Sequence, residues 1–168
     1  MLEYVSKTKS TSISDSAADD LVNKINNLIE KDHTDEFSVG RIRNDLQESM
    51  EENAKIFRSE ETLSKQTEIL ENLRERYENV TIFDKGKVFN TELMEAIELD
   101  YLLDMSESTV ASALARKESR GAHSRQDFPD RDDGNFMKHS FAFKNGNSAN
   151  LRYKDVELGK YEPMERKY

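Results

Sequence analysis

The stretch that decides the fold is "SVGRIRNDLQESMEENAKIF", residues 38–57. Its apolar residues recur at the three- to four-residue spacing of one helix face, with Ala54 between them: Val39, Ile42, Leu46, Met50 and Phe57. The opposite face is acidic, with Glu48, Glu51 and Glu52. This pattern is typical of an amphipathic α-helix that buries one side. The stretch therefore predicts a helix that begins at about Ser38.

Three other segments show helical periodicity on either side of this one. A helix is expected from Ser16 until about residues 31–36, with the stripe Ala17, Ala18, Leu21, Val22, Ile25, Leu28 and Ile29. Ser59 can cap another helix, whose buried row is Leu63, Leu70, Leu73 and Tyr77. The last helix should start near Asn90 or Thr91 and continue through residues 108–119. This helix is apolar on more than one face, which favours burial against more than one neighbouring element.

The sequence pattern changes from helical periodicity to alternation after Gly121. Residues 135–144 alternate, with Met137, His139, Phe141 and Phe143 on one side, and "NGN" at 145–147 is a turn signal. Residues 149–158 would return the chain, so this end predicts a β-hairpin. Residues 1–13 show no clear period and are expected to form an arm, and an extended tail follows the hairpin.

Composition excludes several classes of protein. The 168 residues include no cysteine, so disulfides and thiolate metal sites are excluded. Residues 1–115 carry 13 Lys and Arg against 25 Asp and Glu, and residues 116–168 carry 12 against 9. The acidic residues 1–115 make binding to nucleic acid unfavourable, because they repel its phosphates. No apolar run approaches the length of a membrane span, so we expect a soluble protein.

The segment "RKESRGAHSRQDFPDRDDGN", residues 116–135, is the candidate site. An EF-hand alignment on Gly134 places Pro129 first and Arg131 third, so the calcium interpretation fails. His123 near Asp127 could be an oriented base, with Arg120 or Arg125 holding an anion.

A structural interpretation of the same segment is favoured. Arg116, Lys117 and Arg120 would occupy the last turns of a helix, where cations complement the helix dipole. Gly121 would follow directly after the helix end. Elsewhere, no two of the six glycines are close enough to form a dinucleotide-binding loop.

The segment "ARKESRGAHSRQDFPDRDDGNFMKHS", residues 115–140, resembles the C-terminal region of the flavoprotein subunit of succinate dehydrogenase and fumarate reductase. "IRNDLQESMEENAKIFRSEETL", "VFNTELMEAIELDYLLDM" and "YKDVELGKYEPMERKY" resemble further segments of that family, in the family's order. The resemblance runs from about Val39 to Tyr168.

This resemblance implies a mainly α fold: an up-and-down three-helix bundle (spectrin-repeat-like) with a small C-terminal β-hairpin extension. It divides the chain into a helical bundle with an N-terminal arm, residues 1–121, and a turn, hairpin and extended tail, residues 122–168. The family's FAD-binding domain, capping domain and catalytic residues have no matching positions here. The resemblance therefore implies a fragment without catalytic, cofactor-binding or metal residues, inactive alone, from an oxidoreductase that uses FAD.

The resemblance also implies partners and a location. The partners would be the flavin-binding domain of the parent chain and an iron–sulfur subunit, with no nucleic acid and no membrane insertion. The location would be cytoplasmic, peripheral at the inner face of the cell membrane in a respiratory complex. Residues expected to serve interdomain or subunit docking, and to lie exposed in this chain, are Arg116, Glu118, Arg120, Gly121, His123, Arg125 and Asp127. Of these, His123 and Asp127 would also fix the turn after Gly121.

The alternative is a free-standing helical interaction module that binds a partner through its acidic helices. The acidic front of the chain and the lack of a complete catalytic site support this alternative. An upstream reading frame that encodes a flavin domain would exclude it.

Overall fold

The computed structural model describes residues 6–8, 12, 14–146, 148–161 and 163–164. Most of the expected N-terminal arm and the end of the expected tail lie outside the described residues. So does Asn147 of the expected hairpin turn.

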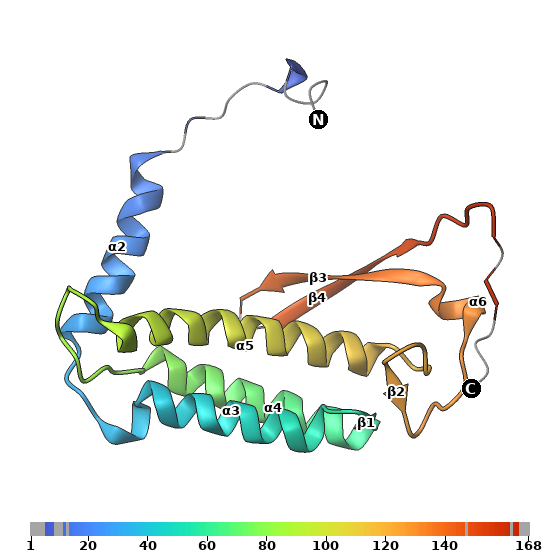
Figure 1. Cartoon of the computed structure of the whole chain (residues 1–168), viewed down its shortest axis with the longest axis horizontal. Helices are drawn as coiled ribbons and strands as arrows, with labels where there is room; N and C mark the ends of the chain where they lie inside the picture. The colour runs from blue at the N-terminus through green and yellow to red at the C-terminus, as the bar shows by residue number, and fades with distance from the viewer. Residues whose placement is uncertain (1–5, 9–11, 13, 147, 162, 165–168) are drawn as a thin grey trace.

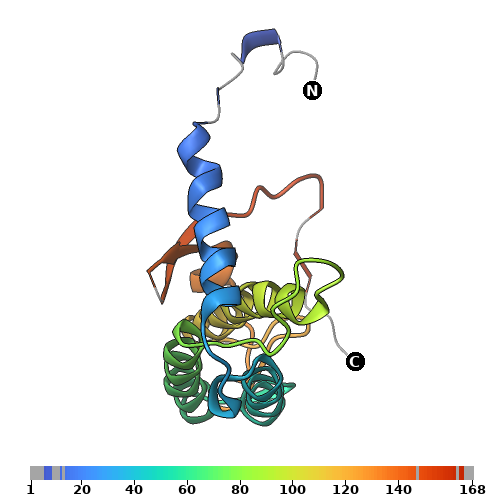
Figure 2. The same ribbon diagram turned by 90° about the vertical axis from the view of Figure 1, so that its left-hand side faces the viewer.

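Three helices lie side by side and form the body of the protein. They are α3 (Val39–Asn53), α4 (Glu60–Glu78) and α5 (Thr91–Ala115). Helix α5 runs along the other two and contacts both (Figures 1 and 2). The short 3-10 helix η1 (Asp35–Phe37) leads into α3. The predicted mainly α bundle with a C-terminal hairpin is therefore confirmed.

The helix starts follow the capping signals in the sequence. Ser59 Oγ accepts a hydrogen bond from the backbone N–H of Thr62 at 3.2 Å, and Thr62 Oγ1 accepts one from the N–H of Ser59 at 3.1 Å. This reciprocal pair is a capping box at the start of α4. At the start of α5, Asn90 Oδ1 accepts from the N–H of Leu93 at 2.8 Å. Caps of this type satisfy amide groups that have no partner within the helix.

Substitution of Ser59 by Ala tests the capping box. We expect the free energy of unfolding to fall by about 1 kcal/mol, because the first turn of α4 loses its acceptor. Ser64→Ala is the matched control, since Ser64 is an exposed residue inside the same helix and alanine is favoured there. Urea unfolding followed by circular dichroism measures both variants. Equal stability of the two would show that the cap is dispensable.

The core lies among α3, α4 and α5. Its fully buried members include Ile42, Leu63, Leu99 and Leu103, each 0% exposed. Ile42 and Leu63 come from the apolar rows that the sequence pattern predicts, and these rows are buried together with one side of α5. The expectation that α5 is buried around most of its circumference is wrong, because Tyr101, Leu102 and Met105 are 61%, 41% and 65% exposed.

The first long helix, α2 (Asp15–Glu30), differs from expectation. Its apolar stripe was expected to be buried, yet Leu21 is 61% and Val22 53% exposed, while Leu28 near its end is buried. Figure 1 shows the reason, because α2 projects away from the end of the bundle and only its last part reaches the other helices.

A buried polar group joins α3 to α4. Asn53 Nδ2 donates to Gln66 Oε1 at 3.1 Å, and Gln66 Nε2 donates to Ser49 Oγ at 3.0 Å. Gln66 is 0% and Asn53 2% exposed. Buried amides that satisfy one another in this way fix the register of two packed helices.

The C-terminal part forms two small sheets around α5. Strands β3 (Lys138–Asn145) and β4 (Ser148–Asp155) pair antiparallel, and Gly146 at the turn has φ 60°. This hairpin lies along α5 (Figure 1). Strands β1 (Phe57–Arg58) and β2 (Ser124–Arg125) pair in parallel, which brings the segment after α5 onto the connection between α3 and α4. Between β2 and β3 lies the one-turn helix α6 (Asp133–Phe136).

Candidate functional site

The segment after α5 leaves the helix earlier than predicted. Helix α5 ends at Ala115, and Arg116 as its C-cap is already extended, with φ −88° and ψ 97°. The prediction that Arg116, Lys117 and Arg120 occupy the last turns of a helix is therefore wrong. Gly121 has the expected positive φ, 59°, but for another reason. It lies in a tight turn closed by two backbone hydrogen bonds between Arg120 and His123, at 2.8 and 3.0 Å.

Arg125 satisfies the carbonyl end of α5. Its Nη1 donates to the carbonyl oxygens of Ala113 at 3.0 Å and Leu114 at 3.1 Å. The side chain of Arg125 is 0% exposed. A cation at this position complements the negative end of the helix dipole, so the role predicted for Arg116, Lys117 and Arg120 belongs to a residue farther along the chain.

Arg125 also joins the C-terminal segment to the start of α4. Its Nε and Nη2 each donate at 2.8 Å to a different oxygen of Asp127, and Nη2 donates to Glu60 at 3.0 Å. The second oxygen of Asp127 accepts from the backbone N–H of Glu60 at 2.8 Å. The hydrogen bonds from Arg125 hold the pKa of Asp127 well below its usual range, and the Glu60 amide adds to this effect.

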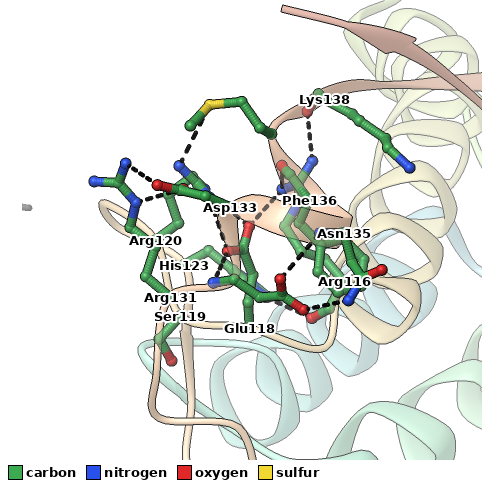
Figure 3. A network of polar contacts seen from close by, with 12 residues as sticks. Arg116, Glu118, Ser119, Arg120, His123, Arg131, Asp133, Asn135, Phe136 and Lys138 are labelled. Carbon is green, nitrogen blue, oxygen red and sulfur yellow. Dashed lines mark hydrogen bonds and ion pairs between the residues drawn. The ribbon is translucent and has the colours of Figure 1, made fainter. Parts of the chain in front are cut away.

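A second cluster surrounds Glu118, whose side chain is 0% exposed (Figure 3). It accepts from Arg116 Nη1 at 2.6 Å, from Arg120 Nε at 2.9 Å and from the backbone N–H of Asp132 at 2.8 Å. Burial by itself opposes ionisation, yet these hydrogen bonds keep the pKa of Glu118 below its usual value. A carboxylate in this site stays charged because the guanidinium and amide groups that contact it all donate hydrogen bonds to it.

Arg116 extends the same cluster to the hairpin. Its guanidinium donates to the carbonyl oxygens of Phe136 at 2.8 Å and Lys138 at 2.7 Å, and to Ser140 Oγ at 3.0 Å. Figure 3 shows this side chain reaching from the end of α5 to the start of β3. Arg120 completes the cluster through Asp133 at 2.6 Å.

The predicted docking residues are thus brought together, but largely inside the chain. The expectation that they lie exposed is wrong for Glu118 and Arg125, both fully buried. It is also wrong for Arg116 and Arg120, whose side chains are only 14% and 28% exposed. The physical reason is mutual neutralisation, because each guanidinium meets carboxylates of this chain. Sequence reasoning missed Glu60, which lies 65 residues from Arg125, and local spacing carries no signal for such a pair.

His123 is held neutral by its neighbours. Its Nδ1 lies 3.1 Å from Arg58 Nη1, and its Nε2 lies 3.1 Å from the carbonyl oxygen of Arg116. Arginine only donates and a carbonyl only accepts, so Nδ1 accepts and Nε2 carries the proton. Desolvation lowers the pKa of His123, and the charges of Arg58, Arg125 and Arg116 lower it further against the raising effect of the Arg116 carbonyl. With both nitrogens engaged, His123 positions two arginines.

This arrangement predicts a pH dependence of stability. Folded His123 binds a proton less readily than unfolded histidine, whose pKa is 6.5. Its contribution to stability is therefore complete above pH 6.5 and is lost progressively as the pH falls toward the lower folded pKa. We expect a shallower loss of unfolding free energy below pH 6.5 in His123→Gln than in the unsubstituted chain. Urea titrations at several pH values measure both slopes, and identical slopes would refute a neutral His123.

No group of three or more His, Asp or Glu side chains suited to a metal ion occurs within the described ranges. The only histidine of the candidate site, His123, directs its ring nitrogens at Arg58 and at the Arg116 carbonyl. The arrangement serves ion pairing and hydrogen bonding within the chain.

Residues 43–168 match the protein family described as "Fumarate reductase flavoprotein C-term". The chain belongs to this family. The family resemblance predicted from residues 115–140 and the other quoted segments is therefore confirmed. The matched range spans α3 to the hairpin and includes both clusters of the flavoprotein C-terminal domain.

Named relatives of this flavoprotein domain agree with the family. The fumarate reductase flavoprotein subunit of Haemophilus influenzae is 37% identical over 155 residues, which are 92% of this chain and 26% of that protein. The succinate dehydrogenase flavoprotein subunit of Rickettsia bellii is 36% identical over 147 residues, 87% of this chain and 24% of that protein. A solved chain of Escherichia coli quinol fumarate reductase superimposes with a TM-score of 0.87 at 33% identity, over 97% of this chain and 28% of that one.

The flavoprotein C-terminal domain spans about a quarter of the length of the curated relatives it matches. Within the part of the chain that the structure describes, no helix is both long enough and apolar enough to cross a membrane.

Proposed function

We propose that this chain is the C-terminal structural domain of a flavoprotein subunit that interconverts succinate and fumarate. The observation that carries the proposal is the family match over residues 43–168, together with the fold shared with quinol fumarate reductase. The complete subunit would use FAD and pass electrons to an iron–sulfur subunit, at the inner face of a respiratory membrane.

The residues of this chain do not fit a role in holding FAD. Its six glycines offer no closely spaced pair for a dinucleotide loop, and the candidate site is filled by its own ion pairs. FAD and the dicarboxylate would therefore be bound by the portion of the subunit outside this chain, which we call the flavin portion.

The two clusters would act in docking by holding surfaces in position. Arg116 and Glu118 tie the hairpin to the end of α5, and Arg125 and Asp127 tie the same segment to α4. Buried arginine–carboxylate groups of this kind fix geometry more reliably than they add stability. The flavin portion and the iron–sulfur subunit would then meet a rigid domain face.

Co-expression with the flavin portion from the same genome tests this function. We expect the two polypeptides to purify together, and the pair to oxidise succinate with an artificial electron acceptor. This chain alone should show no turnover. Failure of the two to associate would favour the free-standing interaction module, and turnover by this chain alone would contradict a structural role.

A further inference from the structure

A pocket of about 520 Å³ lies between β1, the second half of α5 and the start of β3. Three permanent cations line it, Arg58, Arg116 and Lys138, together with four hydroxyl side chains that include Ser112 and Ser140. Among the described residues that line the pocket, none is acidic. This concentration of positive charge is unusual in a chain whose net charge is −9.

The three cations differ in how they are compensated. Arg116 contacts the Glu118 carboxylate at 2.6 Å. Arg58 contacts no carboxylate among the described residues. Its Nε donates to the carbonyl oxygens of Ala54 and Lys55, and its Nη1 meets neutral His123. The other half-buried or buried arginines behave differently, since each contacts at least one carboxylate: Arg43, Arg74, Arg76, Arg120, Arg125 and Arg131.

Partial burial makes this lack of compensation costly. Desolvation lowers the pKa of Arg58, which means that its charge is disfavoured where it lies. The side chain is nevertheless fixed, because two backbone carbonyls and His123 hold it at the pocket wall. Lys138, on the other side of the pocket, likewise contacts no carboxylate within the described part of the chain. Arg58 and Lys138 thus place two positive charges without a carboxylate partner among the described residues on the walls of one pocket, and such charges favour an anion.

An exposed apolar stripe on α5 leads to this pocket. Met94, Tyr101 and Met105 are 58%, 61% and 65% exposed, and Ser112 of the pocket follows Met105 after seven residues. At 100° per residue these positions share one side of the helix. The buried residues Leu99 and Leu103 lie on the other side. A small anion would fill the pocket and leave the stripe in water, whereas a polypeptide would cover both.

We propose that the pocket binds a carboxylate side chain, Asp or Glu, of the flavin portion, whose apolar side chains cover the stripe. This inference rests on the proposed function and adds to it the site and chemistry of the contact. The length of chain available supports this occupant, because about three quarters of the Haemophilus influenzae relative lies outside the matched region. The Arg58 guanidinium and the Lys138 ammonium bind the carboxylate from two sides, and the hydroxyl groups of the pocket fix its orientation.

The test measures binding between this chain and the flavin portion by titration calorimetry. Arg58→Gln and Lys138→Gln each remove one positive charge from the pocket, and we expect each to weaken binding roughly 30-fold or more, as loss of one partner of a desolvated ion pair does. The salt dependence of binding should also become weaker. Arg41→Gln and Lys65→Gln are matched controls, because they remove the same charges from exposed positions on α3 and α4. Lys138→Gln guards against misfolding, since the Lys138 ammonium forms no hydrogen bond or ion pair with the part of the chain that the structure describes.

The outcomes separate the two proposals. Tight binding by the unsubstituted chain, unchanged in both pocket variants, would overturn the carboxylate contact and leave the proposed function intact. Absence of binding by the unsubstituted chain would overturn both. Saturable binding of succinate to this chain alone, or a dimer of it, that Arg58→Gln abolishes without changing affinity for the flavin portion would assign the pocket to another occupant and overturn the inference.

Discussion

Arg125→Ala is expected to destabilise the chain by about 3–5 kcal/mol, because it removes a fully buried cation and leaves two backbone carbonyl oxygens and a partly buried carboxylate without their donor. The Arg125 guanidinium is fully buried, and all its nitrogens donate. Its removal would leave Asp127 with only the Glu60 amide as a partner, and would leave two carbonyl oxygens at the end of α5 without the donors that Arg125 supplies. A loss of this size is a large fraction of the stability of a typical domain.

Urea unfolding followed by circular dichroism measures the effect of Arg125→Ala. Lys65→Ala is the control, because the Lys65–Glu52 pair is exposed and surface pairs contribute only about 0–1 kcal/mol. Arg125→Lys should lie between the two, since an ammonium cannot reproduce the planar fork that reaches Asp127 and the helix end together. If Arg125→Ala unfolded at the same urea concentration as Lys65→Ala, the buried cluster would contribute nothing to stability.

Arg74→Met is expected to destabilise the bundle by roughly 3 kcal/mol or more at neutral pH, because it leaves the Glu107 carboxylate without a cation and leaves Asp100 and Asp104 with one lysine each. The side chain of Arg74 is 6% exposed and contacts Asp100 at 2.6 Å, Asp104 at 2.6 Å and Glu107 at 2.8 Å. These contacts join α4 to α5. Asp104 also accepts from Lys144 of the hairpin at 2.7 Å, so this acid keeps one cation in the variant.

The pH dependence distinguishes this ionic effect from simple loss of packing. Burial opposes ionisation of Asp100, but the hydrogen bond and charge of Lys24 and the charge of Arg74 lower its pKa below 3.8. Without the charge of Arg74 the pKa of Asp100 should rise, so acid should protonate this carboxylate at a higher pH than in the unsubstituted chain. We therefore expect the stability difference between Arg74→Met and the unsubstituted chain to shrink as the pH falls toward 4. A difference independent of pH would indicate that Arg74 acts only through its aliphatic part.

Much of the fold could be predicted because helices and hairpins depend on neighbouring residues. The row of α3 up to Met50, the row of α4, the caps at Ser59 and Asn90 and the turn at Gly146 all follow from spacings shorter than ten residues. The prediction that Phe57 belongs to the α3 row is wrong, because α3 ends at Asn53 and Phe57 is 68% exposed in β1. The same reasoning failed at the end of α5, where Arg116, Lys117 and Arg120 were expected to continue the helix. The carbonyl end is satisfied instead by Arg125, which the tight turn at Gly121 returns to it.

By itself, the sequence determined the helices, their caps, the hairpin and the family, because periodicity and motif order are local or linear properties. Only the tertiary structure decided which charges are paired. Arg125 meets Glu60, Arg74 meets three acids of α5, and Arg58 is left beside His123 without a carboxylate among the described residues. An ion pair depends on distance in space and on the water excluded around it, and neither quantity is set by separation along the chain.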